Sequence, residues 1–104
     1  MGRIEVGETP EQGAMREMSE ESGLKPLNLK KIGIIHPANG AVKTTMHIFL
    51  CTEFEAAERH LDSGEQGLEQ KWIPLETWNR MIKDNQITDG DTLSAWAIYL
   101  CQNA

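Results

Sequence analysis

The chain has 104 residues, of which 39% are hydrophobic and 25% charged, values that are typical of one globular domain spanning residues 1–104. Sixteen acidic and ten basic residues give a net charge of −6. This charge argues against a nucleic-acid partner, because phosphate binding needs stripes of Lys and Arg. No apolar run approaches the ~18 residues of a membrane helix, and the first residues lack the apolar stretch of a signal peptide, so we expect no membrane partner.

The first predicted element is a helix over residues 9–22. Thr9 is a natural N-cap, Pro10 suits the first helical position, and Gln12 completes a capping-box pattern with Thr9. Gly23 follows as the residue that ends the helix.

The rest of the chain predicts a mixture of strands and helices. In chain order we expect strands at 27–36 and 44–52, a mostly irregular stretch at 53–70, a short strand at 71–75, a helix at 76–83, a turn at 84–90 and a last helix. Asp91 or Thr92 is expected to cap the last helix. Cys51 and Cys101 lie in apolar runs without a CxxC spacing, which indicates free, buried thiols and a cytoplasmic location.

The first helix is acidic in an unfavourable place. Glu17, Glu20 and Glu21 are spaced at i, i+3 and i+4 and fall within one arc of about 100°. Each such like-charge pair costs about 0.2–0.5 kcal/mol, and the helix dipole disfavours negative charge near the C-terminus. Two interpretations remain open: a solvated acidic face, or a site where Mg²⁺ or Mn²⁺ takes carboxylate oxygens as ligands. Arg16, four residues before Glu20, could hold a carboxylate in place.

Residues 2–24 read GRIEVGETPEQGAMREMSEESGL, and this segment resembles the Nudix box. The box is Gly, five residues, Glu, seven residues, Arg-Glu, an aliphatic residue, any residue, Glu-Glu, any residue, Gly and an aliphatic residue. Its positions are filled here by Gly2, Glu8, Arg16, Glu17, Met18, Glu20, Glu21, Gly23 and Leu24. A chance match has a probability on the order of 10⁻¹⁰ per start site at average residue usage.

The resemblance implies a fold, a cofactor and roles for individual residues. The fold would be α/β, or α+β: the Nudix-type α/β/α sandwich with a mixed sheet. Glu17, Glu20 and Glu21 would bind Mg²⁺ or Mn²⁺, Glu8 would support that metal site, and Arg16 would orient the carboxylates. The backbone carbonyl of Met1 would be a further ligand. The implied reaction is hydrolysis of a nucleoside diphosphate linked to another moiety, with water attacking phosphorus.

A weaker resemblance points to one branch of the family. Residues 72–75 (WIPL), 81–82 (MI) and 87–93 (ITDGDTL) are similar to the corresponding region of ADP-ribose pyrophosphatases and related ADP-compound hydrolases. ADP-ribose or a similar ADP-linked small molecule would then be the substrate. The general base of that branch is a Glu in the loop before the WIPL segment, which makes Glu65 the first candidate and Glu69 the second. The alternative for both residues is a solvated loop acid. Trp72, Trp78 and Trp96 are expected in the core.

Because the box begins at residue 2, the strands that precede it in the family are expected to be missing. Exposed strand edges invite pairing with another chain, so we expect a homodimer. Two functions stay open: a working metal-dependent hydrolase, or a truncated, non-catalytic remnant that dimerises and binds metal or nucleotide weakly.

Overall fold

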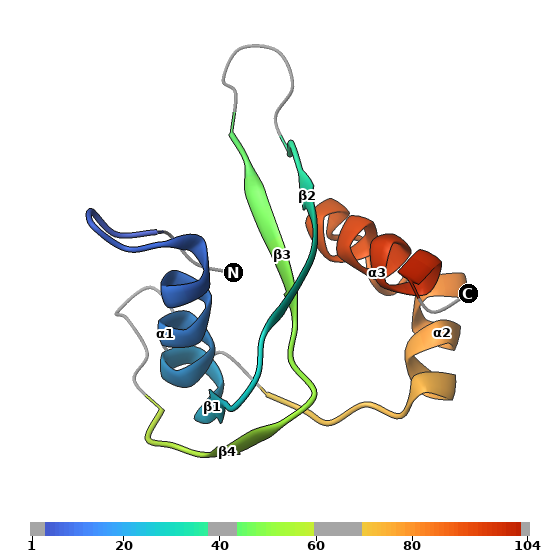
Figure 1. The fold of residues 1–104 in the computed structure, drawn as a ribbon. Helices are drawn as coiled ribbons and strands as arrows, with labels where there is room; N and C mark the ends of the chain where they lie inside the picture. Colours follow the sequence, from blue (N-terminus) through green and yellow to red (C-terminus); the bar gives the residue numbers. More distant parts are fainter. Residues whose placement is uncertain (1–3, 38–43, 60–69, 103–104) are drawn as a thin grey trace. The chain divides into compact units, whose positions relative to one another are not determined.

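The computed structural model describes residues 4–37, 44–59 and 70–102 and contains three helices and four short strands (Figure 1). The elements are α1 (Pro10–Ser22), β1 (Leu24–Pro26), β2 (Lys30–Ile35), β3 (Met46–Leu50), β4 (Phe54–Ala56), α2 (Leu75–Lys83) and α3 (Gly90–Gln102). The expected α/β class is confirmed. The described strands form two two-stranded sheets, β1 with β4 and β2 with β3.

The chain divides into two compact units, which we describe separately. The first comprises the described residues of Met1–Lys31 and Phe49–Glu69, and it contains α1, β1 and β4. β1 and β4 are antiparallel, with Leu24 opposite Ala56 and Pro26 opposite Phe54. The N–H of Leu27 donates to the carbonyl of Glu53 at 2.7 Å, so the pairing extends past the end of β1.

The second unit comprises the described residues of Ile32–Ile48 and Gln70–Ala104. In it, Gly33 of β2 lies so close to α3 that a Cβ built on this glycine would be 3.2 Å from Cδ1 of Ile98. Gln102, at the end of α3, donates from its side-chain amide to the carbonyl of Ile32 at 3.2 Å. The rings of Trp78 and Trp96 join α2 to α3 in an edge-to-face contact, with centroids 5.9 Å apart.

Several predicted elements are confirmed in position. The helix expected at 9–22 is α1, and the strands expected at 27–36 and 44–52 contain β2 and β3. The helix expected at 76–83 is α2, which begins one residue earlier, and the last helix is α3.

The predicted strand at 71–75 is wrong. Residues 71–74 are irregular, and Leu75 is already the first residue of α2. Pro74 is the N-cap, with ψ of 144°. This short apolar run therefore precedes a helix that begins after Pro74, and no described strand pairs with it.

The stretch expected to be mostly irregular, 53–70, contains β4, and the short strand β1 was not predicted.

The capping of the last helix also differs from the prediction. Asp89, rather than Asp91 or Thr92, accepts from the backbone N–H of Thr92 at 2.9 Å and from its hydroxyl at 2.6 Å. These two bonds lower the pKa of Asp89 from its ordinary value, since both stabilise the carboxylate. The residue was missed because Asp89, Asp91 and Thr92 are all residue types that cap helices.

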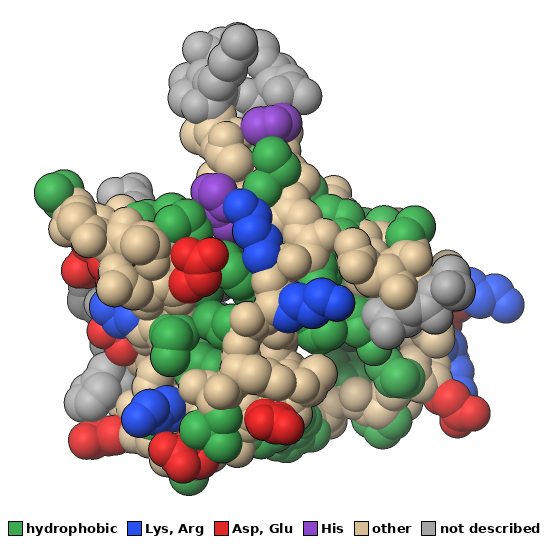
Figure 2. All heavy atoms as spheres, in the orientation of Figure 1, with side chains coloured by type: hydrophobic (Ala, Val, Ile, Leu, Met, Phe, Trp, Pro, Cys, Tyr) green, Lys and Arg blue, Asp and Glu red, His purple; other side chains and the backbone are tan. Residues whose placement is uncertain are grey.

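Apolar side chains are less buried than the sequence predicts. In the part of the chain that the structure describes, no large apolar side chain is fully buried. Trp72 is 74% exposed, which contradicts its expected core position, and Cys101 is exposed although it is a free thiol as predicted. Apolar side chains are visible on the surface in Figure 2. None of the described helices is long and apolar enough to cross a membrane.

Candidate active site

Local hydrogen bonds between backbone and side chains hold the short segment before α1 against the helix. The capping box is present in full: Thr9 Oγ1 accepts from the N–H of Gln12 at 3.2 Å, and Gln12 accepts from the N–H of Thr9 at 2.9 Å. The carbonyl of Glu5 accepts from the N–H of Glu8 at 3.0 Å, in a turn that contains Gly7 with φ of 85°. Together these bonds bring the side chain of Glu8 back over α1.

Gly13 is what allows this close approach. It is the buried residue of α1, and a Cβ on it would be 3.4 Å from Oε1 of Glu8 and 3.6 Å from Cγ1 of Ile4. A glycine inside a helix costs about 1 kcal/mol relative to alanine. At this position the missing side chain leaves room for the segment that carries Glu8.

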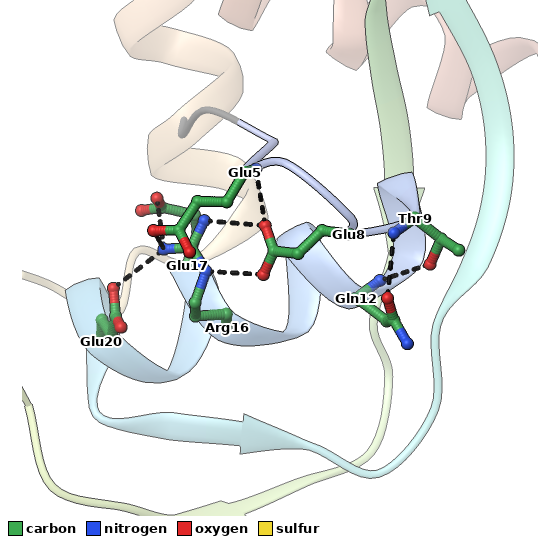
Figure 3. Close-up of polar contacts among 7 residues, drawn as sticks. All are labelled: Glu5, Glu8, Thr9, Gln12, Arg16, Glu17 and Glu20. Atoms are coloured by element: carbon green, nitrogen blue, oxygen red, sulfur yellow. Dashed lines mark hydrogen bonds and ion pairs between the residues drawn. The ribbon is translucent and has the colours of Figure 1, made fainter.

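Arg16 and Glu8 form a bidentate ion pair (Figure 3). Its Nε lies 2.8 Å from Oε2 of Glu8 and its Nη2 lies 3.1 Å from Oε1. Oε1 also accepts from the backbone N–H of Glu5 at 2.8 Å. The hydrogen bonds from Arg16, followed by the one from Glu5, lower the pKa of Glu8, and the bond to Glu8 in turn raises the pKa of Arg16. Both oxygens of Glu8 are therefore engaged within the protein.

The third nitrogen of Arg16 faces the other carboxylates. Its Nη1 lies 2.9 Å from Oε1 of Glu17, 3.2 Å from Oε2 of Glu20 and 3.7 Å from Oε1 of Glu5. The side chains of Arg16 and Glu17 are only 24% and 18% exposed, so this cluster is partly shielded from solvent. Arg16 thus contacts Glu20 as well as Glu17, and its positive charge relieves the carboxylate repulsion on the helix (Figure 3).

The C-terminal end of α1 is closed by Gly23. Gly23 has φ of 71°, in the left-handed region, and its N–H donates to the carbonyl of Ser19 at 3.0 Å. A Cβ on this glycine would lie 3.3 Å from the carbonyl oxygen of Ala57. Gly23 thus suits both the left-handed backbone conformation and the close approach of Ala57, the residue after β4.

Glu21, the third predicted metal ligand, lies in the last turn of α1. Its backbone carbonyl accepts a hydrogen bond from Nε of Arg59 at 2.6 Å. The structure therefore brings Glu17 and Glu20 together on Arg16, while it fixes Glu21 through the main chain. Met1, Glu65 and Glu69 lie outside the described residues.

The donor chemistry of α1 suits a divalent cation. Carboxylate oxygens are the ligands that Mg²⁺ and Mn²⁺ prefer, and three such side chains lie within five residues of one helix. Within the described ranges, no three His, Cys, Asp or Glu side chains already converge as a metal cluster, since Glu17 and Glu20 are bonded to Arg16. The residues fit a cation on condition that these carboxylates exchange contacts with Nη1 for contacts with the ion.

The sequence did not point to three residues of this region. Glu5, Gly13 and Arg59 stand at positions that the box leaves open or does not reach. A glycine within a predicted helix is a signal that could have singled out Gly13. No comparable signal existed for Arg59, because only the pairing of β1 with β4 brings it to α1.

Comparison with known proteins places this site in a family. The family model for the NUDIX domain matches residues 1–95. The chain is 33% identical over 103 residues to an ADP-ribose pyrophosphatase of Bacillus subtilis (strain 168), an alignment that covers 97% of this chain and 54% of the relative. It is 26% identical over 98 residues to the CMP-5'-(N-acetyl-N-hydroxy-3-aminopropyl)phosphonate hydrolase of Streptomyces rubellomurinus (strain ATCC 31215), covering 93% of this chain and 47% of that protein.

The chain thus spans about half the length of the curated relatives that it matches. No solved structure matches it significantly. The family model covers more than half of the chain, including all of α1 with its carboxylates and Arg16, and on this ground the chain belongs to the Nudix domain family.

Proposed function

We propose that this protein is a Nudix pyrophosphohydrolase that cleaves a nucleoside diphosphate linked to another moiety, with Mg²⁺ or Mn²⁺ as cofactor. The observation that carries the proposal is the cluster on α1, where Arg16 holds Glu8 with two nitrogens and draws Glu17 and Glu20 together with the third. A solvated acidic face would not need a guanidinium that is only 24% exposed at its centre.

In this proposal Glu17, Glu20 and Glu21 hold the cation, and Glu8 anchors Arg16. When bound, the divalent cation supplies positive charge to the phosphate oxygens and makes the attacking water more acidic. Glu8 keeps Arg16 in place beside these ligands, since Nε and Nη2 stay on Glu8 when Nη1 gives up its contacts with Glu17 and Glu20. The protein residues thus set the position of the ligands before the substrate binds.

The substrate class is inferred from the relatives. One relative is an ADP-ribose pyrophosphatase and the other is the hydrolase of a CMP-linked phosphonate, so both are named for a nucleotide joined to a second group. We propose ADP-ribose or a similar ADP-linked compound for this chain because the identity to the first relative is the higher of the two. We further propose Glu65, with Glu69 second, as the general base that takes a proton from the attacking water.

The test is hydrolysis of a substrate panel in the presence of Mg²⁺. The panel contains ADP-ribose, NADH, diadenosine polyphosphates and nucleoside triphosphates, and phosphate release is measured through a coupled phosphatase. ADP-ribose or another ADP-linked compound should turn over. Glu21→Gln should abolish turnover by removing a ligand, whereas Glu65→Gln should lower kcat and leave metal affinity unchanged. Glu53→Gln, at an exposed position in the same unit, is the matched control.

Absence of turnover for every compound at high enzyme concentration would contradict the hydrolase proposal. The second candidate function would then stand: a non-catalytic Nudix-fold protein that binds metal or nucleotide weakly.

The cytoplasmic location indicated by the two cysteines stays a prediction, and both thiols are unpaired in the structure.

We also propose that the protein acts as a homodimer. The described strands form only two-stranded sheets, and an isolated pair of strands is marginally stable in water. Strand edges that no described strand covers can pair with another chain. The large apolar side chains that remain exposed, such as Leu27 at 55% and Ile34 at 45%, support an association that covers more of them.

A further inference from the structure

The C-terminal end of α1 is negatively charged, and no basic residue in the last turn of the helix compensates this charge. Glu20 and Glu21 lie in its last turn, where the helix dipole is negative, and this turn contains no basic residue. The last carbonyls of a helix also lack partners within the helix. Here the carbonyl of Ser19 accepts from the N–H of Gly23, whereas the carbonyl of Glu21 accepts from a side chain that is distant in sequence.

That side chain is Arg59, which is 38 residues from Glu21. The antiparallel pairing of β1 with β4 returns the chain to the end of α1, and the N–H of Ala57 donates to the carbonyl of Gly23 at 2.8 Å. A Cβ on Gly23 would be 3.5 Å from Cβ of Arg59, so the arginine passes directly over this glycine. Its Nε then reaches the carbonyl oxygen of Glu21 at 2.6 Å.

The geometry points to Arg59 as a positioning residue for the cation site on α1, acting through the main chain of Glu21. This inference rests on the proposed function. The hydrogen bond from Nε restrains the peptide that follows Glu21, in the turn of a helix that frays most easily. It thereby restrains the direction of the Cα–Cβ bonds of Glu20 and Glu21, on which a common cation depends.

Loss of the Arg59 charge and loss of its hydrogen bond should affect metal binding in opposite directions. Arg59 is a cation at the end of α1, so removing its charge should by itself strengthen the binding of a second cation. Weaker binding after the removal of Arg59 can therefore be assigned to lost positioning. This difference in sign makes the inference testable without measuring activity.

The experiment measures Mn²⁺ binding to the whole chain by electron paramagnetic resonance, in the absence of substrate. Arg59→Met removes both the charge and the donor, and Arg59→Lys keeps the charge but loses the planar group that carries Nε. We expect a rise in Kd of about tenfold for Arg59→Met, at the low end of the range for residues that orient ligands. The rise should be at least as large for Arg59→Lys, because this variant keeps the repulsive charge without the planar donor.

Lys25→Met is the matched control. Lys25 lies on β1 in the same unit, 3.9 Å from Oε1 of Glu55, and its side chain is 59% exposed. This variant removes one positive charge near the same sheet without touching the end of α1, and its Kd for Mn²⁺ should not rise.

An unchanged or lower Kd for Arg59→Met, in a variant whose helical circular dichroism equals that of the parent, would overturn the inference. If Arg59→Met does not fold, Arg59→Lys decides, and a Kd equal to that of the parent overturns it. A parent protein that does not bind Mn²⁺ would overturn the proposed function together with this inference. Binding by the parent that is insensitive to Arg59 would overturn the inference alone.

Discussion

Nε of Arg16 lies 2.8 Å from Oε2 of Glu8, and this contact ties the segment before α1 to the middle of the helix. Glu8 is eight residues from Arg16 in sequence and cannot lie on the same helix face, since α1 begins only at Pro10. The turn at Glu5 and Gly7 therefore has to fold back for the contact to form. The helix that carries the proposed metal ligands is in this way linked to a residue outside it.

The first prediction concerns Glu8 as the anchor of Arg16. Glu8→Gln should raise the Kd for Mn²⁺ about tenfold and leave the number of bound ions unchanged. The reason is that Arg16, once freed from Glu8, keeps its contacts with Glu17 and Glu20 and competes with the ion for them. Isothermal titration with Mn²⁺ measures both quantities. A lower stoichiometry would instead identify Glu8 as a ligand.

The second prediction concerns how the free energy of unfolding falls at acidic pH. Arg16 and the N–H of Glu5 lower the pKa of Glu8 in the folded state, so this carboxylate contributes stability above its unfolded pKa, about 4.3. That contribution is lost as the pH falls through the lower folded pKa. Urea unfolding between pH 7 and pH 3 should show a shallower loss of stability for Glu8→Gln than for the parent. Equal slopes for the two proteins, with Glu53→Gln as control, would contradict the expected linkage.

The third prediction concerns the effect of the cation on folding. Mg²⁺ at a concentration of 100 times its Kd should stabilise the protein by about 2.7 kcal/mol. Each kcal/mol corresponds to roughly 4–8 °C in Tm for a domain of this size. Calorimetry with and without millimolar Mg²⁺ should show the rise for the parent and for Glu76→Gln, which changes an exposed acid of α2, but not for Glu20→Gln. An unchanged Tm of the parent would count heavily against a metal site on α1.

The fourth prediction concerns the contact between β2 and α3. Gly33→Ala would place a methyl group 3.2 Å from Cδ1 and 3.3 Å from Cγ2 of Ile98, so Ile98 has to move. Such overpacking should lower the free energy of unfolding by about 1–3 kcal/mol. Adding Ile98→Val removes Cδ1 and should recover part of the loss. Gly90→Ala is the control, because a Cβ there meets nothing within 4 Å; a loss of equal size in this control would refute the steric explanation.

The fifth prediction concerns the oligomeric state. Sedimentation equilibrium at micromolar concentration should give twice the chain mass of 11.7 kDa, because association covers strand edges and exposed apolar side chains. Dilution should shift the distribution toward the single chain. A monomer of 11.7 kDa over the whole concentration range would rule out the homodimer.

The sequence by itself determined the helix that carries the site, both of its ends and its family. Thr9 with Gln12 and the left-handed Gly23 are local signals, because they satisfy backbone groups within a few residues of where they stand. The spacing of Glu17, Glu20 and Glu21 is equally local, since a helix converts it directly into one face. For the same reason the contact between Arg16 and Glu20 could be predicted.

Only the tertiary structure decided which residues outside the helix contact its side chains and its C-terminal carbonyl groups. Arg59 reaches Glu21 through a strand pairing that no local pattern encodes, and Glu5 and Glu8 reach Arg16 because the chain folds back over Gly13. The segment at 71–75 shows the converse case. Its apolar residues favour a strand, but a strand needs a partner to satisfy its backbone. No described strand pairs with this segment, and Leu75 begins a helix instead.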